Sequence, residues 1–197
     1  PIIETIAVGH GPILNFNTQL WLNNYREWSK QRSTGENYAV VCYLSQYGFC
    51  DRLSQSIAHG IGKANAQVQL VDLIASDKQE LSALISEASA VVVPTWPIEA
   101  DSELQSNIGT LLASLKQKQW IATYDSYGGN EEPIDFIVNQ LRKLGQKEAF
   151  KPLRVREEPN KSIYQQFEEA GTDLGQILTR KKNIAATKSL DGDLNKA

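Results

Sequence analysis

The chain has 197 residues, 41% hydrophobic and 22% charged, with a formal net charge of −3, which suits one doubly wound α/β domain with appendages. The mild charge excludes a strongly basic surface for nucleic acid or an anionic membrane, and no apolar run approaches the ~20 residues of a membrane span. The lack of a signal-peptide pattern and the two cysteines, Cys42 and Cys50, predict a reducing, cytoplasmic location.

The first 32 residues do not resemble the start of a domain. The run IIETIAVGHGPI predicts a strand that enters a glycine-rich turn, and Leu20, Trp21, Tyr25 and Trp28 then recur at helical spacing. Such an aromatic stripe must lie against another surface. We therefore predict a domain boundary near Ser33 and a helix that depends on a neighbouring domain.

A strand, a tight loop and a helix follow this boundary. Tyr38–Leu44 is an unbroken apolar run, Ser45–Cys50 is a short loop with one glycine, and Asp51–Gly62 has an apolar stripe at helical spacing. The loop amides and the helix dipole of such a unit favour an anion, most often phosphate. The loop is neither a P-loop nor a dinucleotide fingerprint. A phosphate loop and a plain βα turn both remain open at this point.

Strands and helices alternate through the rest of the chain. The further predicted strands are Gln67–Leu73, Ala90–Pro94, Gln119–Tyr124 and Leu153–Val155, and the further predicted helices are Lys78–Ala88, Ser102–Lys116, Glu131–Leu144 and Ser162–Arg180. Gly60–Lys63 predicts a helix C-cap, and the polar residues 181–197 predict a linker. The pattern indicates an α/β fold, a doubly wound five-stranded parallel sheet of order 2-1-3-4-5 between two helix layers.

Three loops should meet where the strand order reverses, between the first and third strands. Trp96 and Tyr127 supply aromatic surface there, and the paired Gly128 and Gly129 let the backbone approach a planar group closely. The candidate binding residues are Ser45, Gln46, Tyr47, Gly48, Phe49 and Cys50, then Pro94, Thr95, Trp96, Pro97 and Ile98, then Ser126, Tyr127, Gly128, Gly129 and Asn130. Aromatic groups around a phosphate nest predict a flat, phosphorylated cofactor.

Several segments together resemble one protein family. The first loop is similar to the flavodoxin phosphate loop, PTWPIEAD is similar to the second flavin loop of flavodoxin-like domains, and YDSYGGNEEPIDFI resembles the third loop of flavodiiron proteins. VGHGPI followed by WLNNYREWS resembles the end of the metallo-β-lactamase-like domain of those proteins. The chain thus resembles flavodiiron proteins of the cyanobacterial and plastid type, which carry a C-terminal flavin reductase extension.

The resemblance implies three parts. Residues 1–32 would be the C-terminal end of a metallo-β-lactamase-like domain, residues 33–180 a flavodoxin-like domain, and residues 181–197 a linker toward a flavin reductase domain. A flavodoxin-like domain of this kind would bind FMN with the three loops described above.

The resemblance also implies an oxidoreductase of which this chain, alone, would be an inactive part. Electrons would pass from NAD(P)H through flavin to a di-iron site that reduces O2 to water. His10, in a His-Gly-Pro turn, would be the last ligand of that site; otherwise it is an ordinary turn histidine. The partner would be a second copy in a head-to-tail homodimer, or a related flavodiiron chain in a heterodimer.

Three departures from the family pattern bear on the cofactor. Cys50 replaces a threonine that closes the phosphate loop, Gly129 replaces an aromatic residue, and Glu131 replaces a glycine. A thiol is a weaker donor than a hydroxyl, and the other two changes remove a stacking surface and add negative charge. The alternative function is therefore a structural or assembly subunit of the same fold with a weak or empty FMN site.

Overall fold

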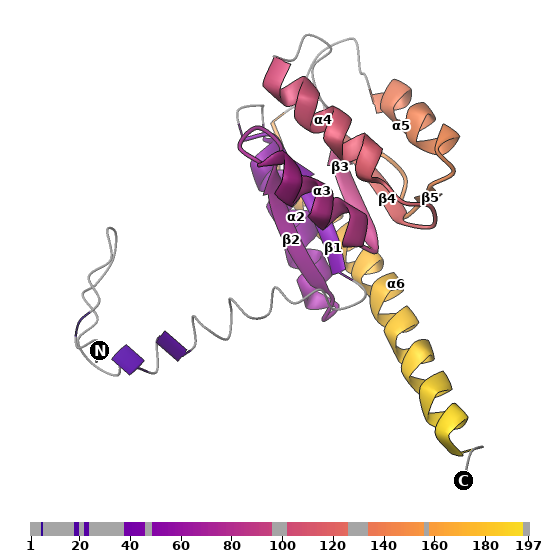
Figure 1. Cartoon of the computed structure of the whole chain (residues 1–197). Helices are drawn as coiled ribbons and strands as arrows, with labels where there is room; N and C mark the ends of the chain where they lie inside the picture. The colour runs from indigo at the N-terminus through magenta and orange to yellow at the C-terminus, as the bar shows by residue number, and fades with distance from the viewer. Residues whose placement is uncertain are drawn as a thin grey trace. The chain divides into compact units, whose positions relative to one another are not determined.

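The computed structural model describes residues 38–45, 49–95, 102–125, 134–155 and 158–194, with the backbone alone at 134–136 and 181–194. Of the first 37 residues it describes 5, 18, 19, 22 and 23. The chain divides into two compact units, Pro1–Gly35 and Glu36–Ala197, and the second contains the sheet (Figure 1). The domain boundary near Ser33 lies outside the described residues and stays a prediction.

The sheet of the second unit is parallel throughout its described pairs. Its first four strands are β1 (Tyr38–Tyr43), β2 (Gln67–Asp72), β3 (Ala90–Pro94) and β4 (Trp120–Asp125). They lie in the order β2-β1-β3-β4, and β5 follows β4. The predicted order 2-1-3-4-5 is confirmed. The chain passes from β1 to β2 in one direction across the sheet and then from β2 back over β1 to β3, so the switch point lies at the end of β1.

The fifth position of the sheet differs from the prediction. We expected one strand, Leu153–Val155, but β5 (Lys147–Glu148) pairs with the first half of β4 and β6 (Leu153–Arg154) pairs with its end. Pro152 lies between the two and has no N–H to give to a ladder, which accounts for the interruption. Two short strands therefore share the position for which one was predicted.

In the described part of the second unit, five helices cover this sheet. They are α2 (Cys50–Lys63), α3 (Lys78–Glu87), α4 (Ser102–Ser114), α5 (Ile134–Lys143) and α6 (Lys161–Leu194). Helix α2 packs against α6 and α3 packs against α4, with the two pairs on opposite faces of the sheet (Figure 1). The predicted three-layer α/β/α arrangement is thus confirmed.

Two predicted helix ends are wrong. The last helix was expected to end at Arg180 but its backbone continues to Leu194. The stretch Gly60–Lys63 was expected to form the C-cap of the first helix, but α2 includes all four residues and Ala64 is its C-cap. Gly60 therefore lies inside the helix, where its missing side chain needs a different explanation.

That explanation is the contact between α2 and α6. A Cβ atom placed on Gly60 would lie 1.9 Å from the Glu168 backbone oxygen, and one on Gly171 would lie 2.1 Å from the Ile57 backbone oxygen. Glycine therefore lets the two helix backbones approach more closely than any side chain permits. Beside this contact Glu168 pairs with His59 and Lys63 on the surface.

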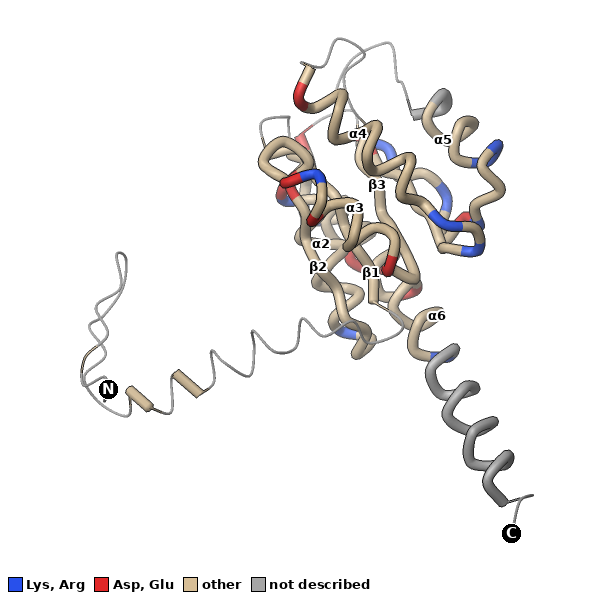
Figure 2. The backbone as a smooth tube through the Cα atoms, viewed as in Figure 1, with Lys and Arg blue, Asp and Glu red and all other residues tan. Residues whose placement is uncertain are grey.

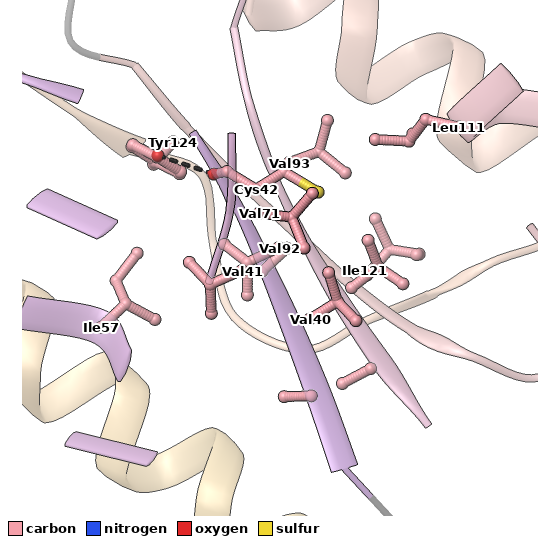
Figure 3. Packing of buried hydrophobic residues seen from close by; sticks show 14 of the residues in the cluster. Val40, Val41, Cys42, Ile57, Val71, Val92, Val93, Leu111, Ile121 and Tyr124 are labelled. Carbon is pink, nitrogen blue, oxygen red and sulfur yellow. Dashed lines mark hydrogen bonds between the residues drawn. The ribbon is translucent and has the colours of Figure 1, made fainter. Parts of the chain in front are cut away.

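The core lies on both sides of β1 and β3. Every residue of β3 is buried, and Val40, Val41 and Cys42 of β1 are fully buried between the helix layers (Figure 3). β-branched residues at these positions pack well on a pleated surface covered from both faces. Phe167, Leu174 and Leu178 of α6 complete the core on the α2 side.

Charged residues of both signs are interspersed on the helices and turns of the second unit (Figure 2). Among the residues that the structure describes, none of the helices combines the length and apolar character needed to cross a bilayer.

Because the two units are compact separately, removing residues 1–32 should leave the sheet domain folded. We expect the truncated chain to keep one cooperative thermal transition by far-UV circular dichroism, within a few degrees of the intact chain. A broad, non-cooperative transition in the truncated chain would show that the sheet domain needs the first 32 residues and would contradict the predicted boundary.

Candidate functional site

The carboxyl ends of β1, β3 and β4 meet at one edge of the sheet, where the three candidate loops begin. Of the predicted site residues, the structure describes Ser45, Phe49 and Cys50 of the first loop and Pro94 and Thr95 of the second. The others lie outside the described residues: Gln46, Tyr47, Gly48, Trp96, Pro97, Ile98, Ser126, Tyr127, Gly128, Gly129, Asn130 and the predicted metal ligand His10. The described part of the site therefore consists of the ends of the loops.

The first loop ends at the N-terminus of α2. Phe49 is the N-cap residue, and among the described residues no side chain caps this helix start. The first backbone N–H of the helix ladder, that of Leu53, donates to the Phe49 carbonyl at 3.0 Å. In any helix the N–H groups ahead of this first ladder bond point out of the N-terminal end, which in α2 adjoins the loop that follows β1. This donor set suits a phosphate.

Two carboxylates lie close to the same loop. The Asp72 Oδ1 atom, at the end of β2, accepts the Ser45 N–H at 3.3 Å and the Ile74 N–H at 3.1 Å. Asp51 lies in the first turn of α2. Burial raises the pKa of Tyr43, and the Asp72 and Asp51 charges raise it further. The helix start can donate to a phosphate, whereas the negative charge that acts on Tyr43 is unfavourable for a dianion in the same loop.

The Cys50 side chain points into the core. It is 1% exposed, its sulfur accepts the Leu44 N–H at 3.2 Å, and it lies 3.1 Å from the Tyr124 hydroxyl. We expected this thiol to replace a hydroxyl that contacts phosphate. In the structure the thiol instead connects the two ends of the first loop, because its sulfur contacts the Leu44 N–H after β1 while its own backbone begins α2.

Tyr124 is a site residue that sequence reasoning missed, as is Asp72. It is fully buried in β4, its hydroxyl donates to the Cys42 carbonyl at 2.9 Å, and its ring meets that of Phe167 edge to face with centroids 6.0 Å apart. Figure 3 shows the bond to Cys42. Burial, followed by the nearby Cys50, raises the pKa of Tyr124 well above its ordinary value. The hydroxyl therefore stays protonated and remains a donor.

The second and third loops are joined where they begin. The Thr95 hydroxyl donates to Asp125 Oδ1 at 2.8 Å, and the Thr95 N–H donates to the Tyr124 carbonyl at 2.8 Å. Both side chains are buried, with Asp125 1% exposed. Thr95 thus links the start of the second loop to the start of the third, and its hydroxyl proton is used in the hydrogen bond to Asp125. The sequence signal for this hydrogen bond is a pair of polar residues, Thr95 and Asp125, at the ends of two buried strands.

No group of three or more His, Cys, Asp and Glu side chains is arranged to hold a metal in the part of the chain that the structure describes.

Replacing Thr95 by valine should lower the free energy of unfolding by about 2 kcal/mol, because it removes the donor to a buried carboxylate without changing the shape of the side chain. The control is Thr110→Val on α4, whose hydroxyl only bonds back to the Ser106 carbonyl. That change should stay within about 0.5 kcal/mol. Urea denaturation measures both, and equal effects would contradict the bridge between the loops.

This fold, with an anion-binding helix start at the switch point of a 2-1-3-4-5 sheet, defines a class of protein. The sequence profile of the flavodoxin family, described as "Flavodoxin", matches residues 41–171. The chain therefore belongs to the flavodoxin family, in the group formed by the diflavin flavoproteins of flavodiiron type.

The assignment to the diflavin flavoproteins rests on similar proteins from Synechocystis and Nostoc. Diflavin flavoprotein A 1 from Synechocystis sp. is 46% identical over 195 residues, which is 99% of this chain and 34% of the relative. The chain thus spans about a third of the length of the curated relatives it matches.

Solved structures of flavodoxin-like domains and of a flavodiiron core are similar to this chain in sequence and fold. The flavodoxin-like domain of a Synechococcus sp. protein is 46% identical, with a TM-score of 0.69 over 72% of this chain and 99% of that one. A diflavin flavoprotein A3 from Nostoc sp. is 38% identical, with a TM-score of 0.71 over 77% of this chain and 99% of that one. A flavodiiron core from Synechocystis sp. is 29% identical, with a TM-score of 0.75 over 90% of this chain and 45% of that one.

Proposed function

We propose that this chain is the FMN-binding electron-transfer module of a flavodiiron oxygen reductase. The observation that carries the proposal is the start of α2, which lacks a side-chain cap among the described residues and lies at the switch point of the sheet in a member of the flavodoxin family. Backbone donors at that place suit the phosphate of FMN. When bound, FMN would supply the transfer of one or two electrons at a time.

The chain's own residues would bind and orient the cofactor. The loop from Ser45 to Cys50 would hold the phosphate, and Thr95–Ile98 and Ser126–Asn130 would flank the ring. Thr95, Tyr124 and Asp125 hold the ends of these loops in place. Buried, hydrogen-bonded supports of this kind order a site before the ligand arrives and so reduce the entropic cost of binding.

The activity of the whole protein is part of the proposal. Electrons would come from NAD(P)H through a flavin reductase, pass through the flavin of this module, and reach a di-iron site that reduces O2 to water. His10 would be one ligand of that site. A second copy or a related flavodiiron chain would complete the site in a head-to-tail cytoplasmic dimer.

A second function is favoured by one observation, the carboxylates of Asp72 and Asp51 beside the first loop. Their charge opposes a phosphate and suits a structural or assembly subunit whose FMN site is weak or empty. An absorbance spectrum and flavin extraction of the freshly purified chain separate the two functions. A flavin spectrum, or its appearance after FMN is added and excess removed, supports electron transfer. Its absence in both cases supports the structural subunit.

This chain alone should bind no iron, because a lone imidazole holds Fe(II) weakly and the resemblance places the other ligands elsewhere. Metal analysis after dialysis against Fe(II) should find well under one iron per chain. Stoichiometric iron that is lost in the His10→Ala variant would contradict this expectation.

A further inference from the structure

The end of β4 touches every loop of the candidate site. The Tyr124 hydroxyl reaches Cys50 at the end of the first loop, and the Tyr124 carbonyl accepts the N–H of Thr95 at the start of the second. The next residue, Asp125, accepts the Thr95 hydroxyl and leads directly into the third loop. Two consecutive residues thus contact or begin all three loops.

The hydrogen bonds around Tyr124 form an ordered chain. The Leu44 N–H donates to the Cys50 sulfur at 3.2 Å, the Cys50 thiol lies 3.1 Å from the Tyr124 oxygen, and the Tyr124 hydroxyl donates to the Cys42 carbonyl at 2.9 Å. The Tyr124 hydroxyl also lies 3.3 Å from the Cys50 carbonyl oxygen, a second and longer acceptor, so it contacts both the side chain and the backbone of Cys50. These hydrogen bonds link the end of β1 to the start of α2, the two elements that flank the first loop.

The Tyr124 ring is held as firmly as its hydroxyl. It is fully buried, and Phe167 of α6 packs against it edge to face at an interplanar angle of 88°. Edge-to-face aromatic pairs have a defined geometry, and a buried ring seldom changes rotamer in a packed core. The hydroxyl therefore has a fixed position from which to hold the first loop.

We propose that Tyr124 is the positioning residue of the flavin site: its hydroxyl holds the phosphate loop through Cys50, and its backbone holds the second loop through Thr95. The inference rests on the proposed function, since it concerns the affinity of the three loops for FMN. Tyr124 itself is buried and contacts the ends of the loops, so its effect on FMN binding passes through Cys50 and Thr95.

The test compares Tyr124→Phe with Tyr38→Phe. The Tyr38 hydroxyl donates to the Leu84 carbonyl at 2.7 Å, and Tyr38 begins β1, at the end of the strand opposite to the loops. Each variant loses a tyrosine hydroxyl that donates to a backbone carbonyl, so both should lower the thermal midpoint. Only Tyr124→Phe should weaken FMN binding, by about tenfold in Kd measured by quenching of FMN fluorescence.

A second variant tests the same link from its other side. Cys50→Ala removes the thiol from the chain of hydrogen bonds and should weaken FMN binding to a similar extent. Because both changes remove the contact between the thiol and the hydroxyl, the loss of affinity in the double variant should be smaller than the two single losses combined. This variant keeps the inference testable if Tyr124→Phe does not fold.

The outcomes separate the inference from the proposed function. Weaker FMN binding by Tyr124→Phe and Cys50→Ala, with an unchanged Kd for Tyr38→Phe, supports the positioning role. Unchanged binding by Tyr124→Phe and Cys50→Ala, or equal weakening by both tyrosine variants, overturns the positioning role while the proposed function stands. Failure of the unmodified chain to bind FMN overturns the proposed function and the inference with it.

Discussion

Replacing Gly60 by alanine should lower the free energy of unfolding by about 3 kcal/mol, because the added methyl group overpacks the contact between α2 and α6. The new Cβ atom would lie 1.9 Å from the Glu168 carbonyl oxygen and 2.8 Å from the Thr172 backbone nitrogen. Both are backbone atoms of a helix, which cannot move aside as a side chain can. Helix α6 would have to shift away from α2, and the core between them would lose its packing.

Gly62, two residues further along the same helix, is the matched control. A Cβ atom there would meet nothing within 4 Å among the described residues, so Gly62→Ala should stabilise the chain by up to about 1 kcal/mol through higher helix propensity. Urea denaturation followed at 222 nm measures both variants. Changes of the same sign would show that the close approach of α2 and α6 is not what the Gly60 position requires.

Truncating Phe167 to alanine should cost about 3 to 5 kcal/mol, because it empties a fully packed position between α6 and the sheet. It also removes the edge-to-face partner of Tyr124. Stability and flavin affinity should therefore fall together in this variant. Thermal unfolding and FMN titration measure the two effects.

The control for Phe167 is a change to leucine, which fills most of the same volume. Phe167→Leu should cost less than about 1.5 kcal/mol. An alanine variant no less stable than the leucine variant would mean that the position is not closely packed. Unchanged FMN affinity in the alanine variant would mean that the ring of Tyr124 does not need Phe167 for support.

The sheet could be predicted because its strands carry an unusual pattern. The apolar runs of β1 and β3 are too short for a core helix and too continuous for a half-exposed strand, so they indicate a parallel sheet covered on both faces. The interruption at Pro152 was not predicted, since a two-residue strand leaves no periodicity to detect. The length of α6 was missed because polar residues beyond Arg180 carry no apolar stripe.

The site was predicted only in part, for a different reason. Loop composition indicated which segments meet at the switch point. In the structure Ser45 follows β1, Cys50 begins α2, and Thr95 follows β3. The direction of a side chain is not encoded in a loop motif. Cys50 turns inward because the core offers it the Leu44 N–H and the Tyr124 hydroxyl.

Tyr124 and Asp72 were missed because each acts across the sheet. Tyr124 follows four mostly apolar residues in β4, where a tyrosine is ordinarily a packing residue, and its partners are 74 and 82 positions away in sequence. Asp72 bonds to Ser45, 27 positions earlier. Contacts of this range depend on strand order and register, which a single sequence supplies only after the fold is known.

The most direct test of the proposed function is a titration of the intact chain with FMN and, separately, with riboflavin, followed by quenching of flavin fluorescence. If the start of α2 binds phosphate, FMN should bind one to one and at least about tenfold more tightly than riboflavin, because the phosphate adds hydrogen bonds to a charged group. Equal affinities for the two flavins, or no saturable quenching by FMN, would contradict the assignment of this site.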